Sequence, residues 1–278
     1  MLDQPPAAAN PLRKLFSVNK PIIGMVHVKP LPGSPRAKSV DLEAVYDAAV
    51  EEALRLVGGG VDGLLLENAG DIPFLKPEDI GYETVGAMSV VGDRIRKATR
   101  VPLGFNIVAN AARASLACAR SSNADFVRVN QWANAYVANE GIIEGAAARA
   151  LRYRSAIGGD DILVFADVHV KHGSHAIVAD RDLSEQTRDV EFFGADVLIA
   201  TGNRTGHAAE VEEIEGIRKG ATRPILVGSG ITPDTAESLL TAADGAIVGS
   251  WFKDSNDMWG DVVPDKVSRL MEKVQRFR

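Results

Sequence analysis

The chain has 278 residues, of which 46% are hydrophobic and 24% charged, a composition typical of a globular protein with a sizeable core. The formal net charge is −6, and no Lys/Arg cluster indicates a nucleic-acid-binding surface, although a local pocket for an anion is compatible with this charge. No apolar run reaches the ~20 residues of a membrane span, and the N-terminus lacks the pattern of a signal peptide. We therefore expect a cytoplasmic protein that binds neither nucleic acid nor membrane.

Short apolar stretches rich in β-branched residues alternate with segments of helical periodicity from residue 21 onward. The expected strands are residues 21–28, 63–68, 102–108, 126–130, 162–171, 196–201, 224–230 and 245–250. The expected helices are approximately residues 41–57, 78–99, 111–121, 141–157, 184–194, 208–219, 233–243 and 264–276. Eight strands, each followed by a helix, predict an α/β fold whose parallel sheet closes into a single (β/α)8 TIM barrel over residues 21–278.

An open, doubly wound sheet is the alternative to the barrel. It requires a glycine-rich fingerprint after the first strand, but residues 25–28 read Met-Val-His-Val. Residues 1–20 form a short N-terminal extension in which the Pro/Ala-rich residues 1–10 are expected to be loosely attached. Apolar residues at helical spacing predict a short helix over residues 11–18 that closes the bottom of the barrel.

Polar side chains gather at the carboxyl ends of the expected strands, which is where (β/α)8 barrels carry their active sites. The loop at residues 203–205 adds further polar groups after the sixth strand. One such residue can simply cap a strand or a loop, but a common position at successive strand ends indicates a site. The residues expected to bind substrate are His27, Asn68, Asn106, Arg128, Asn130 and Thr201.

The fifth expected strand carries three ionisable residues at steps of two. In an extended strand the side chains of Asp167, His169 and Lys171 point to the same side, and together with Glu67 they are the candidate catalytic groups. Asp167 and His169 can act as acid and base, and Lys171 can either form a Schiff base or neutralise substrate charge. No ligand motif of fixed spacing indicates a cofactor, so a divalent metal held by Glu67, Asp167 and His169 is only an alternative.

Glycine-rich segments follow the last two expected strands. The residues are Gly228, Ser229 and Gly230 after the seventh strand, and Gly249 and Ser250 after the eighth. Glycines allow backbone N–H groups to approach a ligand closely, and the first segment runs into the helix expected from residue 233. Loops at these two places commonly bind phosphate in (β/α)8 barrels. We therefore expect a phosphorylated small molecule as the partner of this protein.

Several motifs of this chain match a known family. They are residues 23–27 (Ile-Gly-Met-Val-His), 31–33 (Leu-Pro-Gly), 66–68 (Leu-Glu-Asn), 128–130 (Arg-Val-Asn), 141–144 (Gly-Ile-Ile-Glu), 165–172 (Phe-Ala-Asp-Val-His-Val-Lys-His), 201–202 (Thr-Gly), 228–230 (Gly-Ser-Gly) and 248–250 (Val-Gly-Ser). Through them the chain resembles the BtpA family, the photosystem I biogenesis-type barrel proteins that also include SgcQ-like proteins. The resemblance implies a ribulose-phosphate-binding barrel, similar to the phosphosugar enzymes of tryptophan biosynthesis, and specifies no reaction.

Two functions are compatible with these observations. The first is an enzyme that acts on a phosphorylated sugar or nucleotide-like molecule by isomerisation, aldol-type (lyase) cleavage or glycosidic-bond cleavage. The second is a non-catalytic assembly or regulatory factor of the BtpA type. The density of ionisable groups at the strand ends favours the enzyme, because buried charge costs stability unless it is paired. By analogy with other barrels of this type, we expect a homo-oligomer.

Overall fold

A closed barrel of eight parallel strands forms the centre of the fold, in the computed structural model that describes residues 10–202 and 211–278. Its strands are β1 (Ile22–His27), β2 (Gly63–Glu67), β3 (Leu103–Asn106), β4 (Phe126–Val129), β7 (Leu163–Asp167), β8 (Val197–Ala200), β9 (Ile225–Val227) and β10 (Gly245–Val248). They follow one another around the barrel in chain order, and β10 closes it against β1. This confirms the predicted (β/α)8 barrel.

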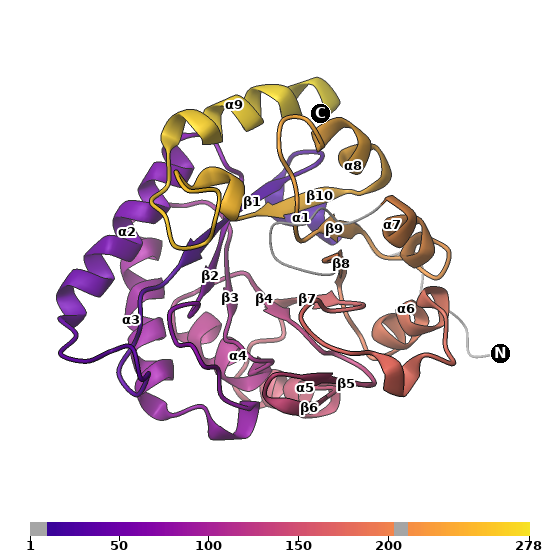
Figure 1. The fold of residues 1–278 in the computed structure, drawn as a ribbon, viewed down its shortest axis with the longest axis horizontal. Helices are drawn as coiled ribbons and strands as arrows, with labels where there is room; N and C mark the ends of the chain where they lie inside the picture. Colours follow the sequence, from indigo (N-terminus) through magenta and orange to yellow (C-terminus); the bar gives the residue numbers. More distant parts are fainter. Residues whose placement is uncertain (1–9, 203–210) are drawn as a thin grey trace.

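Helices surround the barrel on the outside (Figure 1). They are α2 (Leu42–Gly58), α3 (Tyr82–Ala98), α4 (Ala112–Ser121), α5 (Ala147–Ala156), α6 (Leu183–Phe192), α7 (Val211–Arg218), α8 (Ala236–Ala242) and α9 (Pro264–Val274). Short 3-10 turns are η1 (Pro77–Asp79), η2 (Ala176–Val178), η3 (Ser250–Phe252) and η4 (Gln275–Phe277). Because both faces of the sheet are covered, the strands are almost entirely apolar, as parallel strands generally are.

The predicted N-terminal helix is α1 (Pro11–Phe16), which closes the amino-terminal end of the barrel. The side chain of Asn10 caps it by accepting hydrogen bonds from the backbone N–H groups of its first turn. Phe16 packs against Phe126, which stacks on Phe165 with ring centroids 4.4 Å apart. Apolar and aromatic side chains therefore fill the barrel interior at this end. Residues 1–9 lie outside the described part of the chain.

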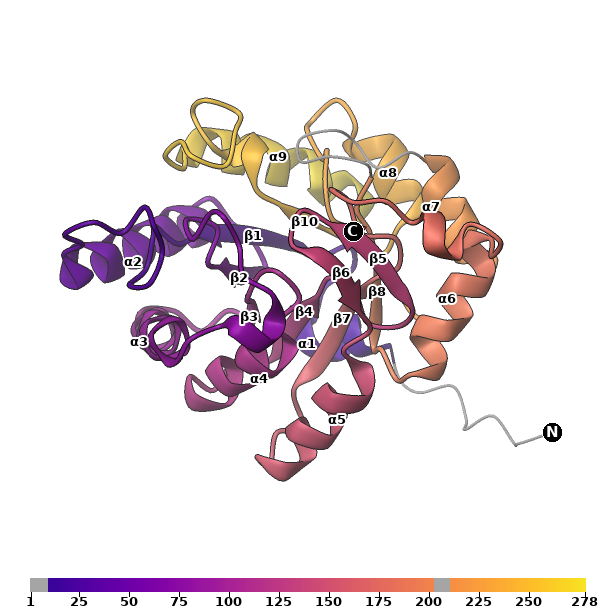
Figure 2. The ribbon, with the colours of Figure 1, turned by 60° about the horizontal axis from the view of Figure 1, so that its bottom comes forward.

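A β-hairpin follows the fourth barrel strand, where the sequence pattern had predicted a loop and a helix from residue 141. The hairpin consists of β5 (Ala135–Ala138) and β6 (Gly141–Glu144), joined by a two-residue turn, and α5 begins only at Ala147. Gly141 has a φ of +101°, which favours glycine and helps to end the turn. Figure 2 shows the hairpin in front of the barrel strands. A bridge between Val137 and Ser174 attaches it to the loop after β7.

Further predictions about elements at the site were wrong, and strands β9 and β10 end at Val227 and Val248 rather than at residues 230 and 250. Strand β7 ends at Asp167 rather than at residue 171, because its pairing with β8 extends only to that residue. Helix α8 begins at Ala236 rather than at residue 233, because the Thr235 hydroxyl donates to the Gly230 carbonyl and accepts from the Thr232 backbone N–H, which holds the preceding residues in a turn. No helix within residues 10–202 and 211–278 combines the length and apolar character that a membrane crossing requires.

Candidate functional site

A layer of polar residues lies directly above the apolar interior of the barrel. Side chains alternate between the two faces of a strand, so an interior-facing residue is followed two positions later by another. On β1 the interior residue Met25 is followed by His27, and on β4 Phe126 is followed by Arg128. The same step on the eight strands gives six polar residues and two glycines, which together we call the polar layer: His27, Glu67, Asn106, Arg128, Asp167, Thr201, Gly228 and Gly249.

Arg128 and Asp167 form a buried, bidentate ion pair in the polar layer. The Nε and Nη2 groups of Arg128 donate to the two carboxylate oxygens of Asp167, each over 3.0 Å, and the two side chains are 5% and 0% exposed. The Asn130 side-chain amide also donates to Asp167, over 3.3 Å. Both oxygens of Asp167 are therefore engaged by its neighbours, and Asp167 holds Arg128 in position at the cavity floor. The geometry favours a positioning role for Asp167 over the predicted role in acid–base chemistry.

Glu67 lies beside this pair and faces the cavity. Its carboxylate accepts a hydrogen bond of 2.7 Å from the Asn106 side-chain amide. Burial raises the pKa of Glu67 above its usual range, while the positive charges of Arg128 and Lys171 oppose this shift. A carboxyl group with a raised pKa can hold a proton at higher pH than an exposed one, which suits a general acid or base.

Lys171 follows β7 and lines the same cavity. Its backbone N–H donates to the Thr201 hydroxyl over 3.1 Å, which fixes the start of the side chain. Burial, reinforced by the positive charge of Arg128, lowers the pKa of Lys171 to about 8, although Asp167 and Glu67 act in the opposite direction. A larger fraction of this amine is therefore neutral near neutral pH than of an exposed lysine.

The lowered pKa of Lys171 predicts a pH-dependent stability. Between pH 8 and 10.5 the unfolded chain binds the proton and the native chain releases it, so the free energy of unfolding is expected to rise with pH in this window. The contribution of one such group is at most about 1.4 kcal/mol per pH unit. Urea unfolding at several pH values measures it, and the rise should shrink in Lys171→Met. Lys97→Met, which changes an exposed lysine, should behave like the wild type; equal pH profiles for the two variants contradict the prediction.

His27, at the end of β1, lines the same cavity, and its surroundings favour the neutral form of its imidazole ring. Burial lowers its pKa to about 3, and the nearby charges of Lys253 and Lys171 act in the same direction. The backbone N–H of His27 donates to Glu52 over 3.0 Å, and the buried Lys253 forms an ion pair with the same carboxylate. The Glu52–Lys253 pair thus ties β1 to α2 and to the loop after β10. Sequence reasoning missed this pair, because neither residue lies in a motif.

The central cavity has a volume of about 420 Å³ and opens at the carboxyl ends of the strands. Its ionisable floor contains His27, Glu67, Arg128 and Lys171, with Asn130 beside them. Its apolar and aromatic wall is formed mainly by Ile72, Phe74, Val108, Tyr136, Val170 and Met258. The hairpin residue Tyr136 was not predicted to take part, although the alternating pattern around Val137 and the turn before Gly141 indicate a hairpin in retrospect.

The two glycine-rich segments lie on one side of this cavity. Gly228, Ser229, Gly249 and Ser250 line it directly. A Cβ atom at Gly249 would lie 3.0 Å from the His27 ring, which is closer than most such contacts, so the absence of a side chain here lets the backbone lie close to this ring. Gly230 lines a smaller neighbouring cavity of about 110 Å³, which also touches Gly249 and Ser250. The Trp251 indole, another of its lining groups, has its N–H buried without a hydrogen-bond partner among the described residues.

Other predicted site residues lie elsewhere. Asn68 accepts a hydrogen bond from the Val108 backbone and donates to Asp71, and it does not line the cavity. Thr201 also lies outside the lining, where its hydroxyl donates to the His169 carbonyl.

His169 stacks on His175 at a centroid distance of 3.7 Å and lines a separate cavity of about 560 Å³. The side chains of residues 167, 169 and 171 were expected to point to the same side of one strand. They do not share one cavity, because the strand ends at residue 167. Residues 203–205 lie outside the described part of the chain.

The alternative metal set is not assembled. Within the described ranges no group of three His, Cys, Asp or Glu side chains is placed to hold an ion. Both carboxylate oxygens of Asp167 accept from Arg128, and His169 faces another cavity than Glu67. These residues therefore do not fit a shared metal.

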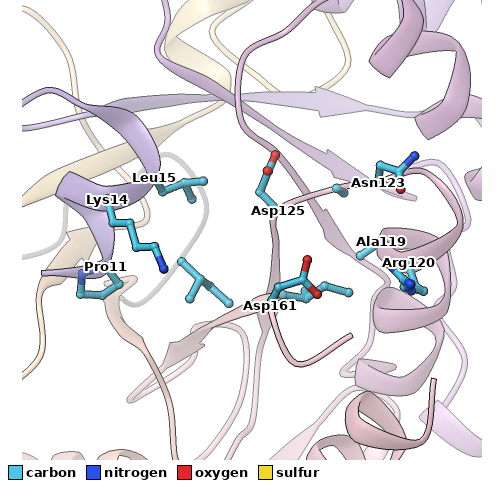
Figure 3. Close-up of a pocket in the computed structure, with 11 residues that line it drawn as sticks. Pro11, Lys14, Leu15, Ala119, Arg120, Asn123, Asp125 and Asp161 are labelled. Carbon is cyan, nitrogen blue, oxygen red and sulfur yellow. The ribbon is translucent and has the colours of Figure 1, made fainter. Parts of the chain in front are cut away.

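A further cavity of about 230 Å³ lies at the opposite end of the barrel, beside α1. Figure 3 shows Lys14 of this helix across from Asp125 and Asp161. The Asp125 carboxylate is engaged by Arg96 at 2.7 Å and by the Leu103 backbone at 2.9 Å. Asp125 thus connects α3 to the start of β3, which is a structural role. We therefore place the functional site in the central cavity.

A closed barrel of eight parallel strands with a polar cavity at their carboxyl ends defines a (β/α)8-barrel protein. The BtpA family model matches residues 18–276, and the chain belongs to the BtpA family. It is 42% identical to an uncharacterized protein of Archaeoglobus fulgidus, with 85% of this chain and 92% of that protein covered. It is 35% identical to the photosystem I biogenesis protein BtpA of Synechocystis, with coverages of 94% and 90%.

Solved structures with the same fold are much less similar in sequence. The tryptophan synthase of Mycobacterium tuberculosis has a TM-score of 0.61 at 14% identity, with 96% of this chain and 98% of that one covered. A geranylgeranylglyceryl phosphate synthase of Thermoplasma acidophilum, in complex with its substrate sn-glycerol-1-phosphate, has a TM-score of 0.58 at 14% identity, with coverages of 96% and 97%. At these identities the likeness establishes the fold alone.

Proposed function

We propose that this protein is an enzyme that acts on a phosphorylated, sugar-like small molecule in the central cavity. The phosphate lies between the segments at residues 228–230 and 249–250, and the reacting part lies over Glu67, Arg128 and Lys171. The observation that carries the proposal is the joint position of these ionisable groups and both glycine-rich segments around one cavity. Its volume of about 420 Å³ is within the range of small-molecule sites.

The electrostatics of the cavity support an anionic ligand. Arg128 keeps its Nη1 group available, because the ion pair with Asp167 uses only Nε and Nη2. The indole N–H of Trp251, which has no hydrogen-bond partner among the described residues, lies in the small cavity next to Gly230 and Gly249. Solved proteins of the same fold include one in complex with a phosphorylated substrate, sn-glycerol-1-phosphate. Phosphate binding by loops after the last two strands is common in such barrels.

An assembly factor is the second candidate, because the chain is 35% identical to a photosystem I biogenesis protein. Such a factor has no need of a cavity floor with several ionisable groups, which cost stability when they are withdrawn from water. The enzyme therefore explains more of the site.

Thermal unfolding with small ligands tests the proposal. Glycerol 3-phosphate, ribose 5-phosphate and ribulose 5-phosphate are compared with glycerol and ribose, and with divalent metal salts. A ligand at a hundredfold excess over its dissociation constant adds about 2.7 kcal/mol to the stability of the native state, which raises Tm by roughly 5 °C or more. We expect this rise with at least one phosphorylated compound and not with its unphosphorylated counterpart. If no phosphorylated compound raises Tm, the proposal is wrong and the assembly factor gains support.

A further inference from the structure

We infer that Lys171 forms an imine with the carbonyl carbon of a phosphorylated aldehyde or ketone. This inference rests on the proposed function and deepens it, since it names the reactive group of the substrate. Three features support it. The Lys171 amine has no ion-pair partner among the described residues, it lies near both an acidic group and a cation, and an apolar wall lies above it.

The Lys171 amine is available for reaction. Among the described residues, the one hydrogen bond of Lys171 is donated by its backbone to Thr201, and no carboxylate lies within ion-pair distance of its Nζ. The other lysine near the cavity, Lys253, is instead neutralised by Glu52. A lysine that served only to balance substrate charge has no requirement for a lowered pKa, whereas a nucleophilic amine has to be neutral when it attacks.

The surroundings of Lys171 suit amine chemistry. The charged and titratable groups that face it are His27 on β1, Glu67 on β2, Arg128 on β4, Asp167 on β7 and Glu213 on α7. Arg128 disfavours a second positive charge and can donate to the carbonyl oxygen. Aromatic and aliphatic side chains form the wall above the floor, and the burial of the Lys171 amine favours its neutral form.

The step is balanced without an external reagent. Glu67 starts in its protonated form. The Nζ lone pair attacks the carbonyl carbon, the C=O π electrons move to oxygen, and this oxygen takes the Glu67 proton to give a carbinolamine whose nitrogen is still protonated. Nitrogen loses one proton to Glu67, and the protonated Glu67 returns it to the hydroxyl group. The C–O bond breaks, water leaves, and the nitrogen lone pair forms the C=N bond of a protonated imine. Glu67 is the group in the floor whose raised pKa suits both transfers.

Reductive trapping tests this inference in the full-length protein. Dihydroxyacetone phosphate and ribulose 5-phosphate are incubated with the protein and sodium cyanoborohydride, which delivers hydride to an imine and leaves a stable secondary amine. Glycerol 3-phosphate and ribitol 5-phosphate are the matched ligands, because they carry the phosphate but no carbonyl. Intact mass and peptide mapping report the adduct, whose added mass is that of the probe minus one oxygen. Tm is recorded for all four ligands.

We expect labelling at Lys171 to exceed that of any other lysine by about tenfold or more, because exposed lysines are largely protonated near neutral pH. Excess glycerol 3-phosphate or ribitol 5-phosphate should suppress it. Lys171→Arg and Lys171→Met should lose it, whereas Lys97→Met should retain it. Mapping of the wild type locates the adduct independently of whether the variants fold.

The outcomes separate the two proposals. A rise in Tm with both members of a ligand pair, without labelling at Lys171, overturns the imine and leaves the phosphate-binding function intact. Labelling spread evenly over exposed lysines also overturns it. If none of the four ligands raises Tm and none labels Lys171, this result counts against both the imine and the proposed function.

Discussion

Asp167→Asn is expected to lower the free energy of unfolding by about 3–5 kcal/mol, because it leaves the buried charge of Arg128 without its counter-ion. The Arg128 side chain is only 5% exposed, so water replaces the carboxylate poorly. The asparagine oxygen can still accept one hydrogen bond, but it carries no charge. Urea unfolding measures the effect as a lower midpoint at an unchanged slope.

Asp93→Asn is the matched control for this variant. Asp93 pairs with Lys97 over 2.6 Å on the exposed surface of α3, and such pairs contribute about 1 kcal/mol or less. The double variant Arg128→Met/Asp167→Leu removes both buried charges and should recover much of the lost stability. If Asp167→Asn costs no more stability than Asp93→Asn, the ion pair does not stabilise the cavity floor as we describe.

Ser229→Asp is expected to weaken the binding of a phosphorylated ligand about 100-fold. Ser229 belongs to the first glycine-rich segment, is buried and lines the cavity, so a carboxylate there meets the proposed phosphate directly. Like charges in contact cost several kcal/mol, and about 2.7 kcal/mol corresponds to this loss of affinity. Isothermal titration with the compound that raises Tm of the wild type measures the dissociation constant.

Ser238→Asp adds the same charge on the exposed surface of α8 and should change the affinity by less than about threefold. It controls for the change in net charge. Should Ser229→Asp and Ser238→Asp bind the ligand equally well, the phosphate does not lie between residues 228–230 and 249–250. The proposed orientation of the ligand is then wrong, even if the cavity binds it.

The barrel was predictable because it depends on local patterns. Apolar runs of strand length, separated by amphipathic segments, require a parallel sheet with both faces covered, and the number of repeats indicates closure. The position of His27, Glu67, Arg128 and Lys171 at one end of the barrel was predictable for the same reason, since parallel strands bring their carboxyl ends together. The hairpin at residues 135–144 was not predicted, because its strands are short and one of them was assigned to a helix.

The sequence by itself determined which residues reach the carboxyl end of the barrel, because the period of two along a strand is a local property. Only the tertiary structure decided what each of them does there. In the folded protein Asp167 pairs with Arg128, His169 lines another cavity, and Asn68 binds the backbone of Val108. The sequence did not predict these roles, because they depend on contacts between segments far apart in the chain. The tertiary structure also leaves Lys171 facing the cavity with no ion-paired carboxylate within residues 10–202 and 211–278, where Glu67 and Asp167 have other partners.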